Sequence, residues 1–134
     1  RGRRLAARAI ELIRPRVWSP AETYTRMVAI DAAVPEPELN AGIRCPESDR
    51  FLGYGDVVWG RRRPARTKLI GEYQGRTFEG KTIHGEEEES RSGDNDRCML
   101  MRDAGWTVLE LYSRDVYTRP GRHKLIRRLR HHLA

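Results

Sequence analysis

The chain has 134 residues, 38% of them hydrophobic and 34% charged, a balance typical of a folded domain rather than a disordered segment. Lysine and arginine total 26 against 19 acids, and the net charge of +7 favours a polyanionic partner, nucleic acid first. The sequence holds no apolar run of membrane-spanning length and no signal-peptide core, so we expect a cytoplasmic protein that does not bind membranes. Cys45 and Cys98 lie far apart and outside any C-x-x-C motif, which favours reduced thiols over a zinc site.

The N-terminal segment, residues 3–14, places apolar side chains at helical spacing between arginines, and Pro15 ends the run. This pattern predicts an amphipathic helix that is either a linker from another domain or docked on the core. Because the chain begins with arginine rather than methionine, we expect further residues upstream. We therefore divide the chain into a helix or linker over residues 1–15 and one domain over residues 16–134.

A second helix has several start signals together. Ser19 suits the N-cap, Pro20 suits the first helical position, and Glu22 stands at the third position of a capping box. Glu22 is therefore either a capping residue or, with its side chain turned away from the cap, a candidate site residue.

Residues 39–45 and 51–59 predict two strands, joined by a turn at residues 46–49. Alternation along the second strand predicts that Tyr54, Asp56 and Val58 share one face. Aspartate is disfavoured within strands, and Asp56 stands among Val57, Val58 and Trp59 in what should be core. Asp56 is therefore a candidate functional acid.

A third strand is predicted within residues 67–75, after a charged turn at residues 61–64. Alternation places Ile70, Glu72 and Gln74 on one face. A buried carboxylate costs several kcal/mol unless a cation or hydrogen-bond donors satisfy it. Glu72 should therefore meet either an arginine or lysine, or a divalent metal held together with the Tyr73 carbonyl and a further acid. A three-strand meander would bring Asp56 within reach of the same ion.

The C-terminal half has fewer candidate residues. Residues 76–92 show no periodicity, and the four glutamates at 86–89 are interpreted as a solvated loop, with metal recruitment as the alternative. A helix is predicted over residues 94–104 with Gly105 as its stop, a strand over 106–112, and a helix over 121–134. Arg127 and Arg128 lie on the charged side of that last helix, which is either a solvated face or a DNA contact.

The order of these elements and acids resembles that of a known superfamily. The residues that carry the likeness are Ser19, Pro20 and Glu22, Asp56 in the segment GDVVW, Glu72 to Gly75 in EYQG, and then Asp94, Arg97, Met101, Gly105, Trp106, Val108, Leu109, Asp115 and Val116. In this order and spacing they resemble the PD-(D/E)XK nucleases, and most closely the very-short-patch-repair (Vsr-like) endonucleases and their bacterial relatives. The likeness covers most of the chain, from Ser19 to Leu133.

The resemblance implies an α/β (α+β) fold with a restriction-endonuclease-like core, in which helices flank a central mixed sheet of about four strands. It also implies a Mg²⁺-dependent DNA endonuclease, with Mn²⁺ as a substitute ion. Asp56, Glu72 and the Tyr73 carbonyl would hold the metal, and Glu22 would bind a second ion or an outer-shell water. Arg97 would offer a cation to the phosphate, with a salt bridge to Asp94 or Asp115 as the equal alternative.

The sequence departs from the family at Gln74, where lysine or, in this branch, aspartate is usual. Glutamine brings no charge and cannot act as a base, although its oxygen can orient water and its amide can contact a phosphate. The zinc-binding residues of the very-short-patch enzymes are not matched either. Two further hypotheses remain: a nuclease fold without chemistry that binds nucleic acid, and a structural domain in which arginines pair with Asp56 and Glu72.

Overall fold

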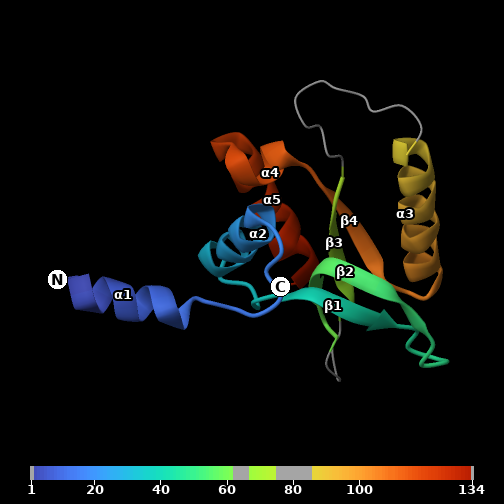
Figure 1. Cartoon of the computed structure of the whole chain (residues 1–134), viewed down its shortest axis with the longest axis horizontal. Coiled ribbons are helices and arrows are strands. Elements are labelled where there is room, and N and C mark those ends of the chain that lie inside the picture. Colours follow the sequence, from blue (N-terminus) through green and yellow to red (C-terminus); the bar gives the residue numbers. More distant parts are fainter. Residues whose placement is uncertain (1, 62–66, 75–85, 134) are drawn as a thin grey trace.

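A four-stranded mixed sheet lies between helices in the computed structural model, which describes residues 2–61, 67–74 and 86–133. On one side lie α2 (Pro20–Asp31), α4 (Ser113–Tyr117) and α5 (Arg119–Leu133), and α3 (Glu86–Asp103) lies on the other (Figure 1). The predicted α+β class, with about four strands flanked by helices, is confirmed.

The strands are β1 (Glu38–Arg44), β2 (Phe51–Trp59), β3 (Leu69–Tyr73) and β4 (Thr107–Leu111), and they neighbour one another in that order. The first three form the predicted antiparallel meander. β3 and β4 are parallel, and α3 precedes β4 in the connection between them. The candidate acids of β2 and β3 are therefore on adjacent strands, as the sequence predicted.

Two hydrophobic cores cover the two faces of the sheet. Because strand side chains alternate, Val57 and Leu69 pack toward α2 and α5, whereas Val58 and Ile70 pack toward α3. The α3-side core also holds Cys98, Met101, Trp106 and Val108. Glu72 alternates with Ile70 along β3 and therefore faces α3.

The β1–β2 hairpin departs from simple alternation at Asn40. Leu39 belongs to the α2-side core but Ala41 belongs to the α3-side core, and between them Asn40 has a positive φ of 44°. On β2, a Cβ added at Gly55 would lie 2.8 Å from a methyl of Val58, so Gly55 faces the α3 side with Val58. Tyr54, which precedes Gly55, is half exposed instead. The prediction that Tyr54 and Val58 share a face is wrong, because the alternation of side chains is interrupted where Asn40 and Asp56 lie opposite each other.

The C-terminal half corrects one sequence prediction and adds one helix. Residues 86–89 form the first turn of α3 rather than a loop, and acidic residues favour that position because of the helix dipole. The five-residue helix α4 was not predicted, and the Asp115 carboxylate begins it by accepting the Tyr112 amide at 2.8 Å. As predicted, α3 stops before Gly105, which has a φ of 90°. The predicted turn at residues 61–64 falls mainly outside the described residues.

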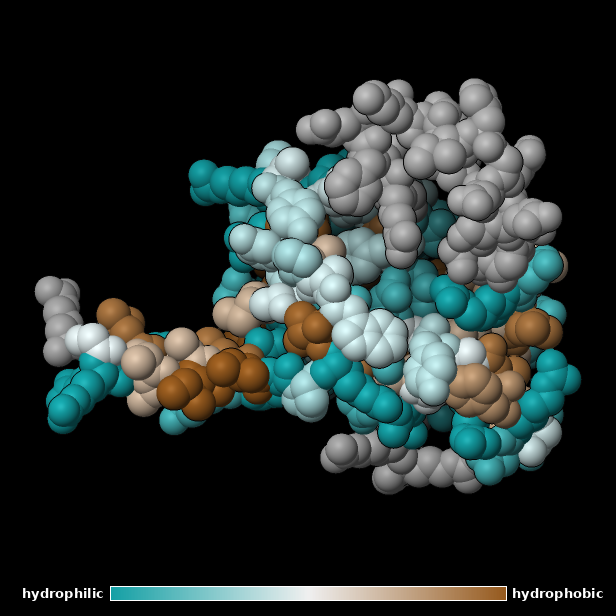
Figure 2. Space-filling model, viewed as in Figure 1, coloured by the Kyte–Doolittle hydropathy of each residue, from teal (hydrophilic) through white to brown (hydrophobic). Residues whose placement is uncertain are grey.

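Helix α1 (Gly2–Glu11) extends away from the rest of the chain and buries none of its residues. Hydrophobic side chains gather along this helix in Figure 2, and Leu5 and Ile10 are mostly exposed. The helix itself is therefore not docked on the core in this structure, and its role as a linker stays a prediction. Cys45 and Cys98 are thiols rather than a disulfide pair. None of the helices within the described ranges is both long and apolar enough to cross a membrane.

Candidate functional site

Asp56 and Glu72 lie against each other's strands at the point where the β2–β3 pairing ends. The last backbone pair is Val57↔Gly71, and the next position on each strand is one of the two acids. The Tyr73 amide donates to Asp56 Oδ2 at 2.8 Å, and the Asp56 amide donates to Glu72 Oε1 at 3.4 Å. Each carboxylate therefore accepts a backbone amide from the strand that carries the other acid, and the two acids come together at one place in the sheet.

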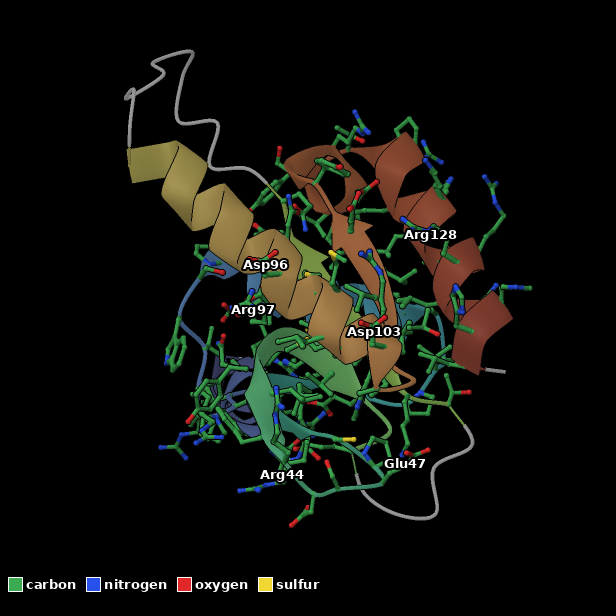
Figure 3. The ribbon with its side chains drawn as sticks, turned by 90° about the vertical axis from the view of Figure 1, so that its right-hand side faces the viewer. Arg44, Glu47, Asp96, Arg97, Asp103 and Arg128 are labelled. Atoms are coloured by element: carbon green, nitrogen blue, oxygen red, sulfur yellow. The ribbon has the colours of Figure 1, made fainter. Side chains whose placement is uncertain are left out.

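Glu72 is 2% exposed, and its charge is balanced by an arginine. Arg97 of α3 donates through Nη2 to Glu72 Oε2 at 2.8 Å, with about a third of the arginine side chain exposed. β2 approaches Arg97 closely at Gly53, where an added Cβ would lie 2.9 Å from Arg97 Cδ. Arg97 points from α3 toward the sheet in Figure 3. Of the two alternatives for Glu72, an arginine partner is therefore present. Of the two alternative partners for Arg97, the side chain of Asp94 lies outside the described residues, and the Asp115 carboxylate accepts the Tyr112 amide.

Glu22 is held in the predicted capping box. Its Oε2 accepts hydrogen bonds from the amides of Trp18 and Ser19, at 2.7 and 3.2 Å, and Ser19 Oγ accepts from the Glu22 amide. A further donor, the Asn40 side-chain amide at 2.9 Å, comes from β1. The structure thus gives Glu22 the capping role. Its expected role at a second metal stays a prediction.

Asn40 is a residue that the sequence reasoning missed. It is 3% exposed, lies opposite Asp56 in the β1–β2 register, and donates to both Glu22 and the Arg16 carbonyl. It therefore connects the cap of α2 with the strand position facing Asp56. An asparagine tolerates a positive φ better than most residues, but nothing in its neighbourhood in the sequence signals these long-range contacts.

Tyr73 separates the acid pair from helix α2. Its ring lies on the α2 side, where the hydroxyl is hydrogen-bonded to Thr25 and donates to the Ala21 carbonyl at 2.6 Å. Burial raises the pKa of this hydroxyl far above its ordinary value, the hydrogen bond with Thr25 lowers it in part, and the charges of Asp56 and Glu22 raise it again. Tyr73 therefore stays protonated and cannot serve as a general base.

The acids around the pair fix what the site can hold. Glu110 of β4 is in register with Glu72, on the same face of the parallel pair, and was not considered from the sequence. It is exposed, and its carboxylate accepts the Tyr112 hydroxyl at 3.1 Å. Among the described residues, no three His, Cys, Asp or Glu side chains are grouped to hold a metal ion. Asp56 and Glu72 are the described acids that this site offers to an ion, and carboxylate oxygens are the ligands that Mg²⁺ prefers.

The remaining candidates lie at different distances from this pair. Gln74 follows β3 directly. Its backbone amide donates to the Leu111 carbonyl, so the backbone of Gln74 is fixed beside β4. Arg128 lies on α5, well away from Arg97 in Figure 3, and neighbouring Arg127 is exposed on the same helix. The structure therefore brings Asp56, Glu72, Tyr73 and Arg97 together. It leaves Arg127 and Arg128 on a separate surface.

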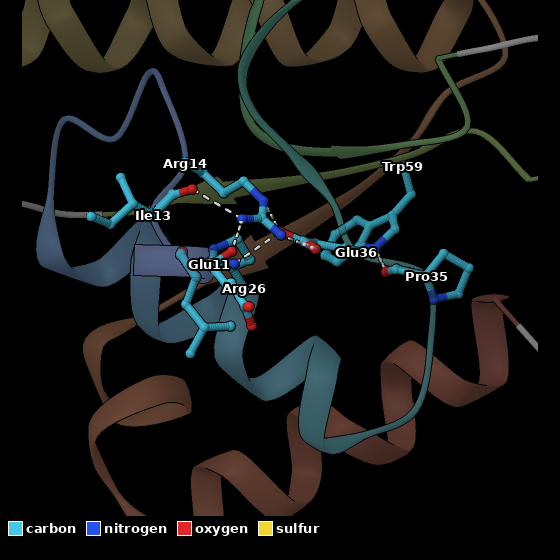
Figure 4. Close-up of polar contacts among 8 residues, drawn as sticks. Glu11, Ile13, Arg14, Arg26, Pro35, Glu36 and Trp59 are labelled. Carbon is cyan, nitrogen blue, oxygen red and sulfur yellow. Dashed lines mark hydrogen bonds and ion pairs between the residues drawn. The ribbon is translucent and has the colours of Figure 1, made fainter. Parts of the chain in front are cut away.

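A second buried charge, also missed from the sequence, ties the segment after α1 to α2. Arg26 is 3% exposed and donates to Glu36 at 2.8 Å and to the Leu12 carbonyl (Figure 4). Its Nε has no hydrogen-bond partner within the described part of the chain. Arg14 pairs with the same Glu36 at 2.8 Å. Burial would raise the pKa of Glu36, but the hydrogen bonds and charges of Arg14 and Arg26 outweigh it and hold the pKa below its ordinary value. These contacts hold the segment that follows α1 against α2.

Comparison with known proteins gives no match: no family model, no curated protein and no solved structure is significantly similar to the chain.

Proposed function

We propose that this chain is a metal-dependent nuclease that hydrolyses phosphodiester bonds in DNA. The observation that carries the proposal is the reciprocal placement of Asp56 and Glu72 where the β2–β3 pairing ends. Carboxylates brought together in a sheet are costly unless they serve a bound cation or receive strong compensation. The net charge of +7 supports a nucleic acid as the partner.

Asp56 and Glu72 would hold the Mg²⁺, with the Tyr73 carbonyl as a third oxygen ligand. A bound Mg²⁺ supplies Lewis-acid polarisation of the phosphate and lowers the pKa of water near it. Tyr73 donates its backbone amide to Asp56 and thereby orients that carboxylate. Arg97 balances Glu72 before substrate arrives and lies close enough to the pair to offer its cation to a phosphate oxygen. The proposed site corresponds to the acid positions of the PD-(D/E)XK resemblance.

The test is cleavage of supercoiled plasmid DNA by the purified chain with Mg²⁺ or Mn²⁺. We expect nicked or linear product, no product with EDTA, and no product from Asp56→Asn. Asp103→Asn is the matched control, because Asp103 is an exposed acid at the end of α3 and should retain wild-type cleavage. Mg²⁺ should also raise the melting temperature of wild type but not of Asp56→Asn, since a ligand stabilises only the state that binds it. Equal cleavage by Asp56→Asn and wild type would reject the proposed site.

A second function is favoured by the Arg97–Glu72 pair. If Arg97 keeps Glu72 occupied permanently, the chain binds nucleic acid without cleaving it. Wild type would then be inactive with both metals, yet its duplex affinity would fall steeply between about 50 and 200 mM salt as condensed counterions are released. Inactivity together with a salt-independent affinity would contradict both functions, and would leave the structural hypothesis in which arginines pair with the core acids.

A further inference from the structure

The outward surface of the β1–β2 hairpin carries a groove of about 370 Å³ that is separate from the Asp56–Glu72 pair. Among the described residues, four basic side chains line it, and Asp49 is the only acidic lining residue. The cations come from different parts of the chain: Arg16, Arg44, Arg61 and Lys68. Arg44 and Arg61 each have one nearby acid, at 4.0 Å from Asp49 and 3.2 Å from Glu38 respectively. The lining therefore keeps an excess of positive charge, which suits an anionic ligand.

Exposed aromatic rings stand beside these cations. Phe51 and Tyr54 are 46% and 49% exposed, and their rings meet edge to face with centroids 5.3 Å apart. The Arg44 guanidinium lies 5.9 Å from the centre of the Phe51 ring. Large apolar rings are usually buried in a core, but on this part of β2 both rings lie at the surface. They offer flat faces to a ligand that itself contains flat rings.

A ligand that combines negative charge with flat aromatic rings matches both sets of residues. We propose that this groove binds an unpaired stretch of nucleic acid, with bases stacked on Phe51 and Tyr54 and phosphates bound by Arg44, Arg61 and Lys68. Stacking on aromatic side chains requires bases that are not already stacked in a duplex, so the groove selects single strands. An acidic peptide would satisfy the cations but would leave the exposed rings without matching partners.

The groove adjoins the candidate active site along β2, because Tyr54 precedes Asp56 by two residues. It lies on another part of the surface from α5: Figure 3 shows Arg44 and Arg128 on opposite sides of the molecule. The inference shares its class of partner with the proposed nuclease function. It does not depend on the chemistry, since binding can be measured without any divalent metal.

The first experiment measures fluorescence anisotropy of a labelled oligothymidylate of about a dozen nucleotides, in EDTA and low salt. We expect Phe51→Ala and Tyr54→Ala each to weaken binding about tenfold, as removing a stacking platform does. Arg44→Gln should weaken binding and reduce the slope of log affinity against log salt by about 0.7, the contribution of one phosphate contact to a single strand. Tyr117→Ala and Arg102→Ala are the matched controls, because both residues are exposed outside the groove and should bind like wild type.

The second experiment uses the wild-type chain, so it cannot fail through misfolding. Cys45 lines the groove, and hydrogen bonds with Ser48 and Glu47 lower the pKa of its thiol, which favours reaction with a disulfide reagent. Cys98 is buried and should react slowly. Saturating oligothymidylate should slow the modification of Cys45 at least severalfold, whereas an equal charge of polyglutamate should not. Unchanged kinetics with bound oligonucleotide would place the nucleic acid elsewhere.

The outcomes also separate this inference from the proposed function. Wild-type affinity of both aromatic variants, or equal competition by duplex, polyglutamate and single strand, overturns the groove even if plasmid cleavage is intact. Loss of cleavage in Asp56→Asn with unchanged oligothymidylate binding and Cys45 protection supports the groove as a site distinct from the acids. An inactive wild type that still shows stacking-dependent binding retains the groove and rejects the nuclease chemistry.

Discussion

Glu22 and Glu72 are both buried, with exposures of 5% and 2%, but their carboxylates are satisfied by opposite kinds of partner. Glu22 accepts hydrogen bonds from uncharged N–H groups: two backbone amides of its own helix cap and one side-chain amide. Glu72 contacts the guanidinium of Arg97 and the backbone of a neighbouring strand. The N–H groups around Glu22 require a hydrogen-bond acceptor at its position, whereas Glu72 is part of a charge balance with Arg97.

The two sets of partners indicate which of the two acids suits a cation site. Moving Glu22 would leave several amides without an acceptor, a cost that opposes any second role. Glu72 already compensates a positive charge, and a metal ion can replace or join a partly exposed arginine without leaving the carboxylate unpaired. Substitutions at Glu72, at Glu22 and at Gln74, which directly follows β3, should therefore have different effects.

Gln74 should give the largest effect, because it would act on the reaction rate. If the acid pair is catalytic, Gln74→Leu removes a polar group beside it and should lower the cleavage rate by about 10²–10³. Gln74→Lys adds an ammonium group at the position where PD-(D/E)XK nucleases, which the sequence resembles, usually carry lysine. Cleavage activity should therefore persist or rise. Initial rates at fixed Mg²⁺ measure both. Wild-type rates for the leucine variant together with an inactive lysine variant would exclude Gln74 from the chemistry.

Glu72 should show that charge is what matters at the sheet. Glu72→Ala leaves Arg97 without its buried counter-charge and should cost about 3 kcal/mol, the low end for a broken buried pair because Arg97 is partly exposed. Glu72→Gln should lower the stability nearly as much, because the uncharged glutamine amide cannot balance the charge of Arg97. Urea unfolding measures both, with Glu110→Gln as the exposed register partner that should change stability by less than about 0.5 kcal/mol. A near-neutral Glu72→Gln would mean that hydrogen bonding, and not charge, satisfies Arg97.

Glu22 should show the reverse pattern at a smaller scale. Glu22→Ala removes the acceptor of the cap and should cost about 2 kcal/mol. Glu22→Gln keeps a carbonyl oxygen at the same position, so it should recover more than half of that loss. The same urea titrations compare the two variants. Equal destabilisation by alanine and glutamine would show that the negative charge of Glu22 matters as well, and would remove the contrast with Glu72.

The two glutamates also differ in how well the sequence predicts them. Ser19, Pro20 and Glu22 stand within four residues, and a cap is made by local hydrogen bonds, so the pattern predicted the structure in detail. The strand that carries Asp56 was likewise predicted with the observed bounds, because apolar and β-branched residues dominate it. Local chemistry was sufficient for both.

Contacts between distant residues could not be predicted in the same way. Arg97 is one of many arginines, and only the packing of α3 against the sheet selects it as the partner of Glu72. The turn at Asn40 depends on contacts with Glu22 and Arg16, which no periodicity reveals. The early start of α3 at Glu86 was missed because four glutamates carry no apolar pattern. The acid pair was therefore predicted, and an arginine was one of the partners expected for Glu72, but the identity of that arginine was not predicted.

Glu36 should give the smallest effect and extends the comparison to a glutamate that is a third exposed. Its pKa in the folded chain is below the ordinary value of 4.5, because Arg14 and Arg26 outweigh the effect of burial. A lowered folded-state pKa means that its stabilising contribution is present above the unfolded-state pKa and is lost as pH falls through the folded-state pKa. Wild type should therefore exceed Glu36→Gln in stability by no more than about 1 kcal/mol near neutral pH, because solvent screens the pairs. That difference should shrink steadily below the ordinary pKa and vanish in acid, as paired urea titrations across this range would measure. A difference that stays constant with pH would mean that Glu36 acts through hydrogen bonds that glutamine cannot reproduce, and not through its charge.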